Sequence, residues 1–291
     1  MQGGGVQYDY FRAVAGTEHI TPKKSLGQNF LIDRNISARI IREFNPKPED
    51  TVMEIGPGEG ALTGLLAESG CRLVAVELDP RAAARIRQDY GTRIEVIEED
   101  VLRLDPRALA DRLGVERIRV IGNIPYYITS PILFHLFDNR ESVSDAMLMM
   151  QREVADRLVA PIRTKDYGIL SVVTRTYAEP KRLFDVGPRC FFPPPNVTSA
   201  VVRLTFKDME GIAGIEDAHR RIVRTAFNQR RKTLRNSLAQ LLDTQEQRER
   251  VFGQAGIDAT RRPEELTPAE FIRLARVYAD ARKNSARDQE T

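Results

Sequence analysis

The feature that most constrains the fold is a regular alternation of short apolar runs and amphipathic segments between residues 51 and 123. The runs TVMEIG, RLVAVELD, RIEVIEED and RIRVIGN have the length and composition of buried strands. Helix-length segments separate them, and one of these begins at Pro80 and ends before Gly91. Strand and helix in turn are typical of a parallel sheet covered by helices on both faces. The sequence therefore predicts a doubly wound α/β sheet.

The pattern changes after residue 143. The run DAMLMMQ predicts a further strand, and VADRLVAP predicts the helix that follows it. Two later runs, GILSVVTRTYAEPKRLFDV and TSAVVRLTF, are β-rich and are joined by a Pro-rich loop with no helix-length segment between them. We therefore expect these two runs to form an antiparallel pair at the edge of the sheet.

After Phe206 the sequence has helical periodicity only. Four segments carry it: DAHRRIVRTAF, RKTLRNSLAQLL, TQEQRERVFGQAG and TPAEFIRLARVYADA. We predict a flexible tail over residues 1–20, a sheet domain over 21–207 and a small all-helical domain over 208–291, with a frayed polar end after Lys283.

The composition, 42% hydrophobic and 29% charged, indicates a globular protein with a substantial core. No run is apolar for long enough to span a membrane, and the first residues lack the apolar stretch of a signal peptide. We therefore expect a cytoplasmic protein. Cys71 and Cys190 are far apart and have no metal-ligand spacing, so we predict neither a disulfide framework nor a metal site.

Three glycines, Gly56, Gly58 and Gly60, lie in the segment MEIGPGEGALT at the end of the first predicted strand. Glycine there permits a tight turn and close approach of the backbone to a ligand, at the sheet edge where open α/β sheets bind one. Glu77, at the end of the second strand, is placed to bind a ribose. The loop alone fits a nicotinamide cofactor or S-adenosylmethionine equally well.

Two observations favour S-adenosylmethionine. Asp100, after the third strand, offers an acceptor for an adenine amino group. A nicotinamide enzyme would also need a proton donor beside the hydride, and we identify no such residue. An alternative interpretation of Asp100 is an ordinary turn or helix-capping acid.

The segment GNIPYYITSPIL follows the fourth strand and places polar groups at the same edge. An exocyclic amine of a nucleobase is a poor nucleophile because its lone pair is delocalised into the ring. The side-chain oxygen of Asn123 and the carbonyl of Ile124 can accept its two hydrogens, and Pro125 restricts the backbone so that they converge. Tyr126 would lie against the base and fix its plane. Without the glycine loop, the same residues would equally suit an ordinary turn.

Five ordered motifs now support a resemblance. The motifs are, in chain order, SLGQNFLID, EIGPGEGALT, GNIPYYITSPIL, FFPPPNVTSAVVRL and AFNQRRKTLRNSL. Between Ser25 and Ala275 the chain resembles the bacterial small-subunit ribosomal RNA adenine N6,N6-dimethyltransferases, the kasugamycin-sensitivity family. The related erythromycin-resistance enzymes share the glycine loop, QNF and NIPY, whereas YITSPIL and NQRRKTLRNSL resemble the small-subunit branch.

The resemblance implies a Rossmann-like methyltransferase sheet that binds S-adenosylmethionine. It implies that Asn29 and Leu31 cover the cofactor and that Gly56 lines its methionine side. It further implies that Glu77 binds the ribose hydroxyls and that Asp100 contacts the adenine amino group.

The resemblance also implies roles at the target base. Asn123 would touch both cofactor and base, with Pro125 beside it, while Tyr126 and Phe191 would sandwich the target adenine. Phe192 leaves the choice of stacking residue open by one position. The implied reaction is dimethylation of two adjacent adenosines in 16S ribosomal RNA during ribosome biogenesis.

The net charge of +3 is unevenly distributed. The segment from His219 to Asn236 has seven basic residues and no acid, which indicates a polyanionic partner more than a solvated face. We expect contacts with RNA phosphates from Arg220, Arg221, Arg224, Arg230, Arg231, Lys232 and Arg235. The expected partner is 16S rRNA in an immature small ribosomal subunit, bound by a chain that is monomeric when free. Two other hypotheses stay open: an assembly factor whose essential act is binding, and a nicotinamide-dependent oxidoreductase.

Overall fold

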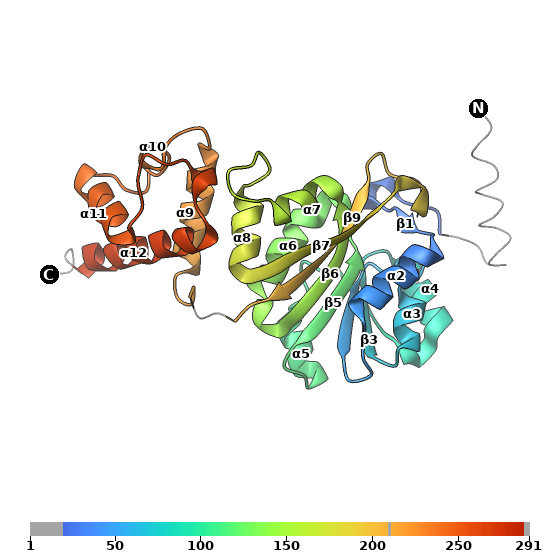
Figure 1. The fold of residues 1–291 in the computed structure, drawn as a ribbon. Coiled ribbons are helices and arrows are strands. Elements are labelled where there is room, and N and C mark those ends of the chain that lie inside the picture. The colour runs from blue at the N-terminus through green and yellow to red at the C-terminus, as the bar shows by residue number, and fades with distance from the viewer. Residues whose placement is uncertain (1–19, 209–210, 288–291) are drawn as a thin grey trace, which may run out of the picture.

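The computed structural model describes residues 20–208 and 211–287 (Figure 1). Of the expected flexible tail, all but residue 20 lies outside the described residues. A sheet with helices on both faces forms one part of the molecule, and a group of helices at the C-terminal end forms the other (Figure 1). No helix in the described ranges has the length and apolar character needed to cross a membrane.

The main sheet has seven strands in the order β4-β3-β2-β5-β6-β9-β7. The first five in this order run parallel, and β9 pairs antiparallel with both β6 and β7. The predicted doubly wound sheet with an antiparallel pair at its edge is therefore confirmed. The strands are β2 (Thr51–Ile55), β3 (Arg72–Glu77), β4 (Glu95–Glu98), β5 (Ile118–Asn123), β6 (Val143–Gln151), β7 (Ala178–Val186) and β9 (Ser199–Phe206).

Helices in the first part begin where the sequence supplies caps. Asp33, Asp79 and Asp105 each accept a backbone N–H of the following first turn, and Pro80 and Pro106 occupy first helical positions. The helices are α2 (Arg34–Phe44), α3 (Thr63–Glu68), α4 (Pro80–Tyr90), α5 (Pro106–Leu113), α6 (Thr129–Asp138), α7 (Arg152–Val159) and α8 (Ile169–Tyr177).

The expectation that residues 169–177 belong to a strand is wrong, since they form α8. β-branched residues such as Val172 and Val173 favour strands in isolation. Here the hydroxyl of Ser171 accepts the backbone N–H of Gly168 at the helix start, and both valines are buried. Packing of this apolar face decides the conformation against local propensity.

A second, two-stranded sheet pairs β1 (Phe30–Leu31) with β8 (Phe191–Phe192). Phe30 lies opposite Phe192, and Leu31 lies opposite Phe191. This pairing brings the N-terminal segment against the Pro-rich loop. Nothing in the hydrophobic pattern of either two-residue strand indicates it.

The C-terminal part consists of α9 (Glu216–Asn228), α10 (Leu234–Ser237), α11 (Gln245–Ala255) and α12 (Pro268–Arg287). The helix expected over RKTLRNSLAQLL is reduced to the short α10 between turns. α12 extends to Arg287, four residues past the point after which a frayed end is expected.

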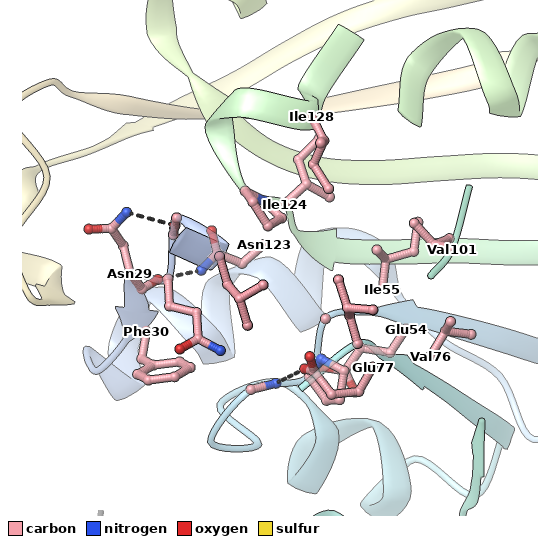
Figure 2. Close-up of a pocket in the computed structure, with 18 of the residues that line it drawn as sticks. Asn29, Phe30, Glu54, Ile55, Val76, Glu77, Val101, Asn123, Ile124 and Ile128 are labelled. Carbon is pink, nitrogen blue, oxygen red and sulfur yellow. Dashed lines mark hydrogen bonds between the residues drawn. The ribbon is translucent and has the colours of Figure 1, made fainter. Parts of the chain in front are cut away.

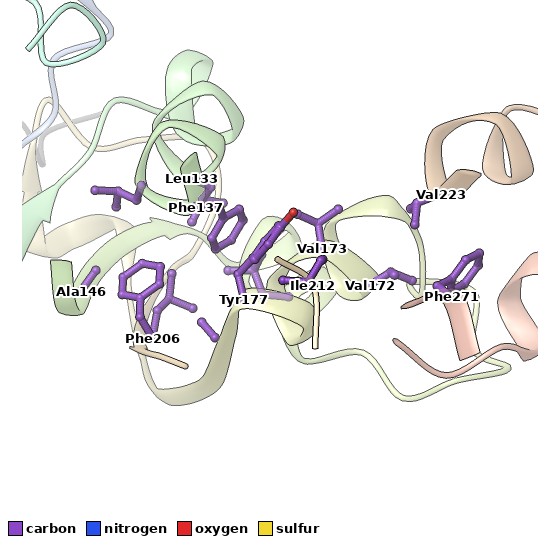
Figure 3. Close-up of a cluster of buried hydrophobic side chains, with 14 of the residues drawn as sticks. Leu133, Phe137, Ala146, Val172, Val173, Tyr177, Phe206, Ile212, Val223 and Phe271 are labelled. Carbon is purple, nitrogen blue, oxygen red and sulfur yellow. The ribbon is translucent and has the colours of Figure 1, made fainter. Parts of the chain in front are cut away.

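One apolar cluster runs from the sheet into the C-terminal helices (Figure 3). The cluster contains Phe206 of β9 and Tyr177 of α8. It also contains Val223 of α9 and Phe271 of α12. The hydroxyl of Tyr167 adds a buried hydrogen bond, 2.8 Å, to the carbonyl of Leu266. The core therefore continues across the division expected near residue 208.

Candidate active site

A cavity lies at the carboxyl ends of β2, β3 and β5, beneath the N-terminal segment 26–31 (Figure 2). Ten of the residues singled out in the sequence line it: Asn29, Leu31, Gly56, Gly58, Glu77, Asp100, Asn123, Ile124, Pro125 and Tyr126. The fold thus brings together residues spread over almost 100 positions. The cavity volume is about 100 Å³, below the ~300 Å³ typical of the smallest ligand pockets. The slot beneath residues 26–31, which we call the cover, is therefore narrow.

The glycine loop has no room for side chains where it meets the cover. Gly56 and Gly58 have φ of 64° and 56°, which L side chains rarely adopt. A Cβ on Gly58 would lie 2.8 Å from the ring of Phe30. On the neighbouring strand, a Cβ on Gly122 would lie 2.6 Å from the carbonyl oxygen of Ile55. Glycine at these positions lets backbone and cover approach closely enough to leave a narrow ligand slot.

Glu77 is fixed at the end of β3 by two backbone groups. Its Oε2 accepts the N–H of Gly58 at 3.1 Å, and its Oε1 accepts the N–H of Asp79 at 2.8 Å. Burial raises the pKa of this carboxyl, while the two N–H groups oppose that rise. The remaining lone pairs can accept hydrogen bonds from a diol such as the ribose hydroxyls.

Asp100 has one oxygen committed to the local turn. Its Oδ1 accepts the N–H of Leu102 at 3.0 Å. Within the described ranges no hydrogen bond reaches its Oδ2, and the residue lines the cavity. The turn-acid interpretation and the ligand interpretation are therefore compatible, because each uses a different oxygen.

Glu54 of β2 is a pocket residue that the sequence reasoning missed. Its carboxyl is fully buried, and burial, with repulsion from Glu77, raises its pKa to about 8. Its Oε2 has no hydrogen-bond partner in the described part of the chain. An acid inside the apolar run TVMEIG was the available signal, since an unpaired buried carboxyl is costly and often marks a functional site. A cationic group in the slot would favour its ionised form.

The cover is held by a buried carboxylate at the N-cap of α4. The Asp79 side chain is completely buried and lies 2.6 Å from a guanidinium nitrogen of Arg81. It also accepts the side-chain amide of Gln28 at 3.0 Å and lies 3.7 Å from the ammonium of Lys23. These hydrogen bonds, above all those from Arg81, hold the pKa of Asp79 well below its usual range. One carboxylate thus connects the N-terminal segment to the second strand–helix unit.

Asn123 ends β5 with its side-chain amide oriented by the cover. Its Nδ2 donates to the carbonyl oxygen of Asn29 at 2.9 Å (Figure 2). The N–H of Ile124 donates to the carbonyl of Met149 at 3.2 Å, which fixes the next residue. Because the amide nitrogen is occupied, the oxygen of Asn123 is the group left for a ligand. Among the described residues none donates to that oxygen.

Two tyrosines follow at the mouth of the cavity. The hydroxyl of Tyr126 lies 2.6 Å from that of Ser199, and burial raises the pKa of the tyrosine. Tyr127 also lines the cavity and is 57% exposed, with its ring against Gly27. Sequence reasoning assigned a role to Tyr126 alone, although the adjacent aromatic residue was visible.

The assignment of Phe191 as a stacking residue does not agree with its position. Phe191 is 1% exposed and belongs, with Leu31 and Phe184, to an apolar cluster separate from the one that reaches the C-terminal helices. It does not line the cavity. Successive residues of a strand point to opposite faces, so Phe192 is the partly exposed member of the pair. Phe192 does not line the cavity either, so the two residues differ in exposure and not in contact with the cavity.

The basic segment meets acids that are distant in sequence. A guanidinium nitrogen of Arg220 lies 2.8 Å from Asp138. Arg230 donates to the carbonyls of Thr164 and Lys165 at 2.8 and 2.6 Å and lies 3.8 Å from Glu264. These two arginines are therefore engaged within the protein, although no acid occurs in their own segment.

The other five basic residues of the segment are exposed: Arg221, Arg224, Arg231, Lys232 and Arg235. In the described part of the chain none of the five forms an ion pair. No group of three or more metal-ligating side chains occurs in the described ranges. The candidate RNA surface is thus smaller than the sequence alone indicated.

Comparison with known proteins gives consistent matches. The family described as "Ribosomal RNA adenine dimethylase" matches residues 20–280. The "Ribosomal RNA small subunit methyltransferase A" of Methylococcus capsulatus is 44% identical over 257 residues, 88% of this chain and 97% of that protein. The protein of the same name from Salinibacter ruber is 47% identical over 272 residues, covering 92% of this chain and 88% of that one.

Two solved structures are similar in fold. A dimethyladenosine transferase from Plasmodium falciparum superposes with a TM-score of 0.74 at 24% identity, over 84% of this chain and 95% of that one. The 23S rRNA methyltransferase ErmE superposes with a TM-score of 0.64 at 30% identity, over 86% of this chain and all of that one.

Proposed function

Because the chain belongs to the ribosomal RNA adenine dimethylase family, we propose that it dimethylates two adjacent adenosines of 16S rRNA within an immature small ribosomal subunit. The family makes it an S-adenosylmethionine-dependent rRNA methyltransferase. This membership decides the choice that the glycine loop left open, and the nicotinamide alternative is wrong. The target subunit, the adjacent pair and the assembly stage are our proposals.

The site residues fit the cofactor. The glycine loop has no room for a Cβ at Gly58. Glu77 offers acceptors for a diol, and Glu54 has a buried oxygen without a hydrogen-bond partner in the described part of the chain. We propose that these residues hold S-adenosylmethionine together with Asp100, under the cover formed by Asn29 and Leu31. The cofactor supplies an electrophilic methyl group on a sulfonium.

The hydrogen bond from Asn123 to Asn29 is the observation that carries the proposal. It leaves the Asn123 oxygen to accept one hydrogen of the adenine amine, and the Ile124 carbonyl would accept the other. Two acceptors draw the nitrogen toward tetrahedral geometry and free its lone pair. Such positioning is worth up to about 7–11 kcal/mol in well-oriented systems. The methylated nitrogen loses its proton readily, so no strong base is required.

Stacking would hold the base in its plane. We propose Tyr126 on one face, with Phe192 in place of Phe191 on the other, because Phe191 is buried. Extruding an adenine costs only a few kcal/mol. The gain from orientation therefore exceeds the cost of extrusion.

We propose further that residues 21–207 form the methyltransferase domain and that residues 208–291 bind RNA. The chain would act in the cytoplasm and be monomeric when free. The exposed basic residues of α9 and of the corner before α10 support RNA contact, because phosphates are held by unpaired cations. A purely binding role in subunit assembly is compatible with the same surface.

The decisive experiment is transfer of radiolabelled methyl groups to purified ribosomal subunits from cells that lack the modification. We expect dimethyladenosine in small-subunit RNA and no label in large subunits, which serve as the matched control. Label in the large subunit only would refute the proposed substrate. Binding to small subunits without any transfer would favour the assembly role.

A further inference from the structure

A polar hollow of about 350 Å³ lies within the C-terminal helices, away from the methyl-transfer cavity. Its wall comes from α9, the turn after α10, α11 and α12. Three arginines line it, one from each long helix: Arg221, Arg250 and Arg282. Asp243 is the single acid in its lining. The hollow therefore has an excess of positive charge.

The three guanidinium groups have no ion-pair or hydrogen-bond partner among the described residues. Other arginines of the same helices are engaged: Arg220 with Asp138, Arg248 with the carbonyl of Leu242, and Arg276 with the carbonyl of Gly211. Arg282 has only a ring contact, 6.0 Å above Tyr278. Three arginines without such a partner in the described ranges, each from a different helix, therefore line this one hollow.

Arginines left without acids around a polar cavity match an anion with several acceptor oxygens. The guanidinium fork suits phosphate geometry, and an aromatic ring behind one arginine restricts its rotamers. Gln240 and Gln247 add neutral donors to the same wall. The tetrahedral phosphate of an RNA backbone carries its charge on two non-bridging oxygens, and guanidinium groups from different helices can donate to each of them.

We propose that this hollow binds a phosphate of the RNA backbone, at a point outside the segment that receives the methyl groups. The inference rests on the proposed function, since RNA is the polyanion with which the family's enzymes work. It adds Arg250 and Arg282 to the RNA-binding surface. Neither belongs to the basic segment from His219 to Asn236.

The test compares R250Q/R282Q with the wild-type protein in binding to a transcript of small-subunit rRNA at several salt concentrations. Each lost phosphate contact lowers the salt slope by about 0.7–0.9. We expect a slope smaller by about one contact and weaker binding at low salt. R250K/R282K should retain the slope, because lysine binds phosphate as a point charge. R42Q/R107Q, which removes two exposed arginines on α2 and α5, is the charge-matched control and should not alter the slope.

An unchanged slope in R250Q/R282Q overturns the proposal, even if inorganic phosphate stabilises the wild-type protein against heat. Stabilisation of the double variant by S-adenosylmethionine checks that it is folded. Failure of the proposed function is distinguishable, because it would appear as absent methyl transfer by the wild-type protein. If the hollow binds no phosphate, the wild-type protein still transfers methyl groups, and the salt slope of the double variant equals that of the wild type.

Discussion

The side-chain nitrogen of Asn123 donates to the backbone carbonyl of Asn29 across 94 positions of the sequence. This bond ties the residue proposed to accept the adenine amine to the segment proposed to cover the cofactor. The orientation of the Asn123 amide therefore depends on the cover being in place. One hydrogen bond therefore links the proposed binding of the adenine amine to the position of the segment that covers the cofactor.

Replacing Asn123 by Ala should lower methyl transfer about 100-fold or more, because an acceptor and the alignment of the amine are both lost. Small-subunit binding should change little, since no phosphate contact is removed. N123D is the sharper variant: a carboxylate cannot donate to the Asn29 carbonyl, so it should fail as well. Radiolabelled transfer measured beside subunit binding checks this, and full activity of either variant would refute the role.

Replacing Asp79 by Ala should weaken S-adenosylmethionine binding, because Gln28 and Lys23 lose their anchor on the buried carboxylate. The loss of the cap on α4 should also cost about 1 kcal/mol of unfolding free energy. D89A, which breaks the exposed Arg85–Asp89 pair on the same helix, is the matched control. Calorimetric titration of the cofactor distinguishes them, and equal affinities in the two variants would contradict the clamp.

Glu54 predicts a pH dependence of stability. Its folded pKa of about 8 lies above the ordinary 4.5, so between these values the native state holds a proton that the unfolded state has released. Unfolding free energy should therefore fall as pH rises through this window, by linkage. In E54Q this contribution is absent. Between pH 5 and 8.5 the melting temperature of the wild-type protein should fall relative to that of E54Q as pH rises. A constant difference between the two melting temperatures would show that Glu54 is already ionised.

The two adjacent phenylalanines should respond oppositely. F191A removes a buried ring and should cost about 3–5 kcal/mol of stability. F192A should leave the melting temperature almost unchanged and reduce methyl transfer, because a stacking face is lost. Thermal unfolding and transfer kinetics on the same samples separate the two effects. A stable, inactive F191A would restore Phe191 as the stacking residue.

In the corner before α10, substitution of Arg230 should affect stability, whereas substitution of its neighbours Arg231 and Lys232 should affect RNA binding. R230A should lower stability, since it breaks contacts with the Thr164 and Lys165 carbonyls. R231A/K232A should leave stability intact and flatten the salt dependence of RNA binding. An unchanged salt slope in R231A/K232A would mean that these side chains are only solvated.

Periodicity and end signals were sufficient to predict the parallel strands, their helices and the edge at which the site lies. The reason is that strand ends in an α/β sheet share one edge, so residues after successive strands converge. The same reasoning placed Gly56, Glu77, Asp100 and Asn123 at one cavity, as the structure confirms.

Other features depend on contacts that no local pattern contains. α8 is helical because Val172 and Val173 bury against tertiary partners, although their propensity favours a strand. The burial of Phe191 follows from β1 pairing with β8, and the neutralisation of Arg220 follows from Asp138 on another helix. Each requires knowing which distant segments meet.

The apolar core is continuous between α8 and the C-terminal helices, and this bears on the distance between the basic residues of α9 and the methyl-transfer site. Since Val172, Val223 and Phe271 share that core, we expect the basic face of α9 to keep a fixed position relative to Asn123. An RNA must therefore present its phosphates and its adenosines at one set separation. Selection of the substrate would then depend on the three-dimensional spacing of the RNA as well as on the identity of its bases.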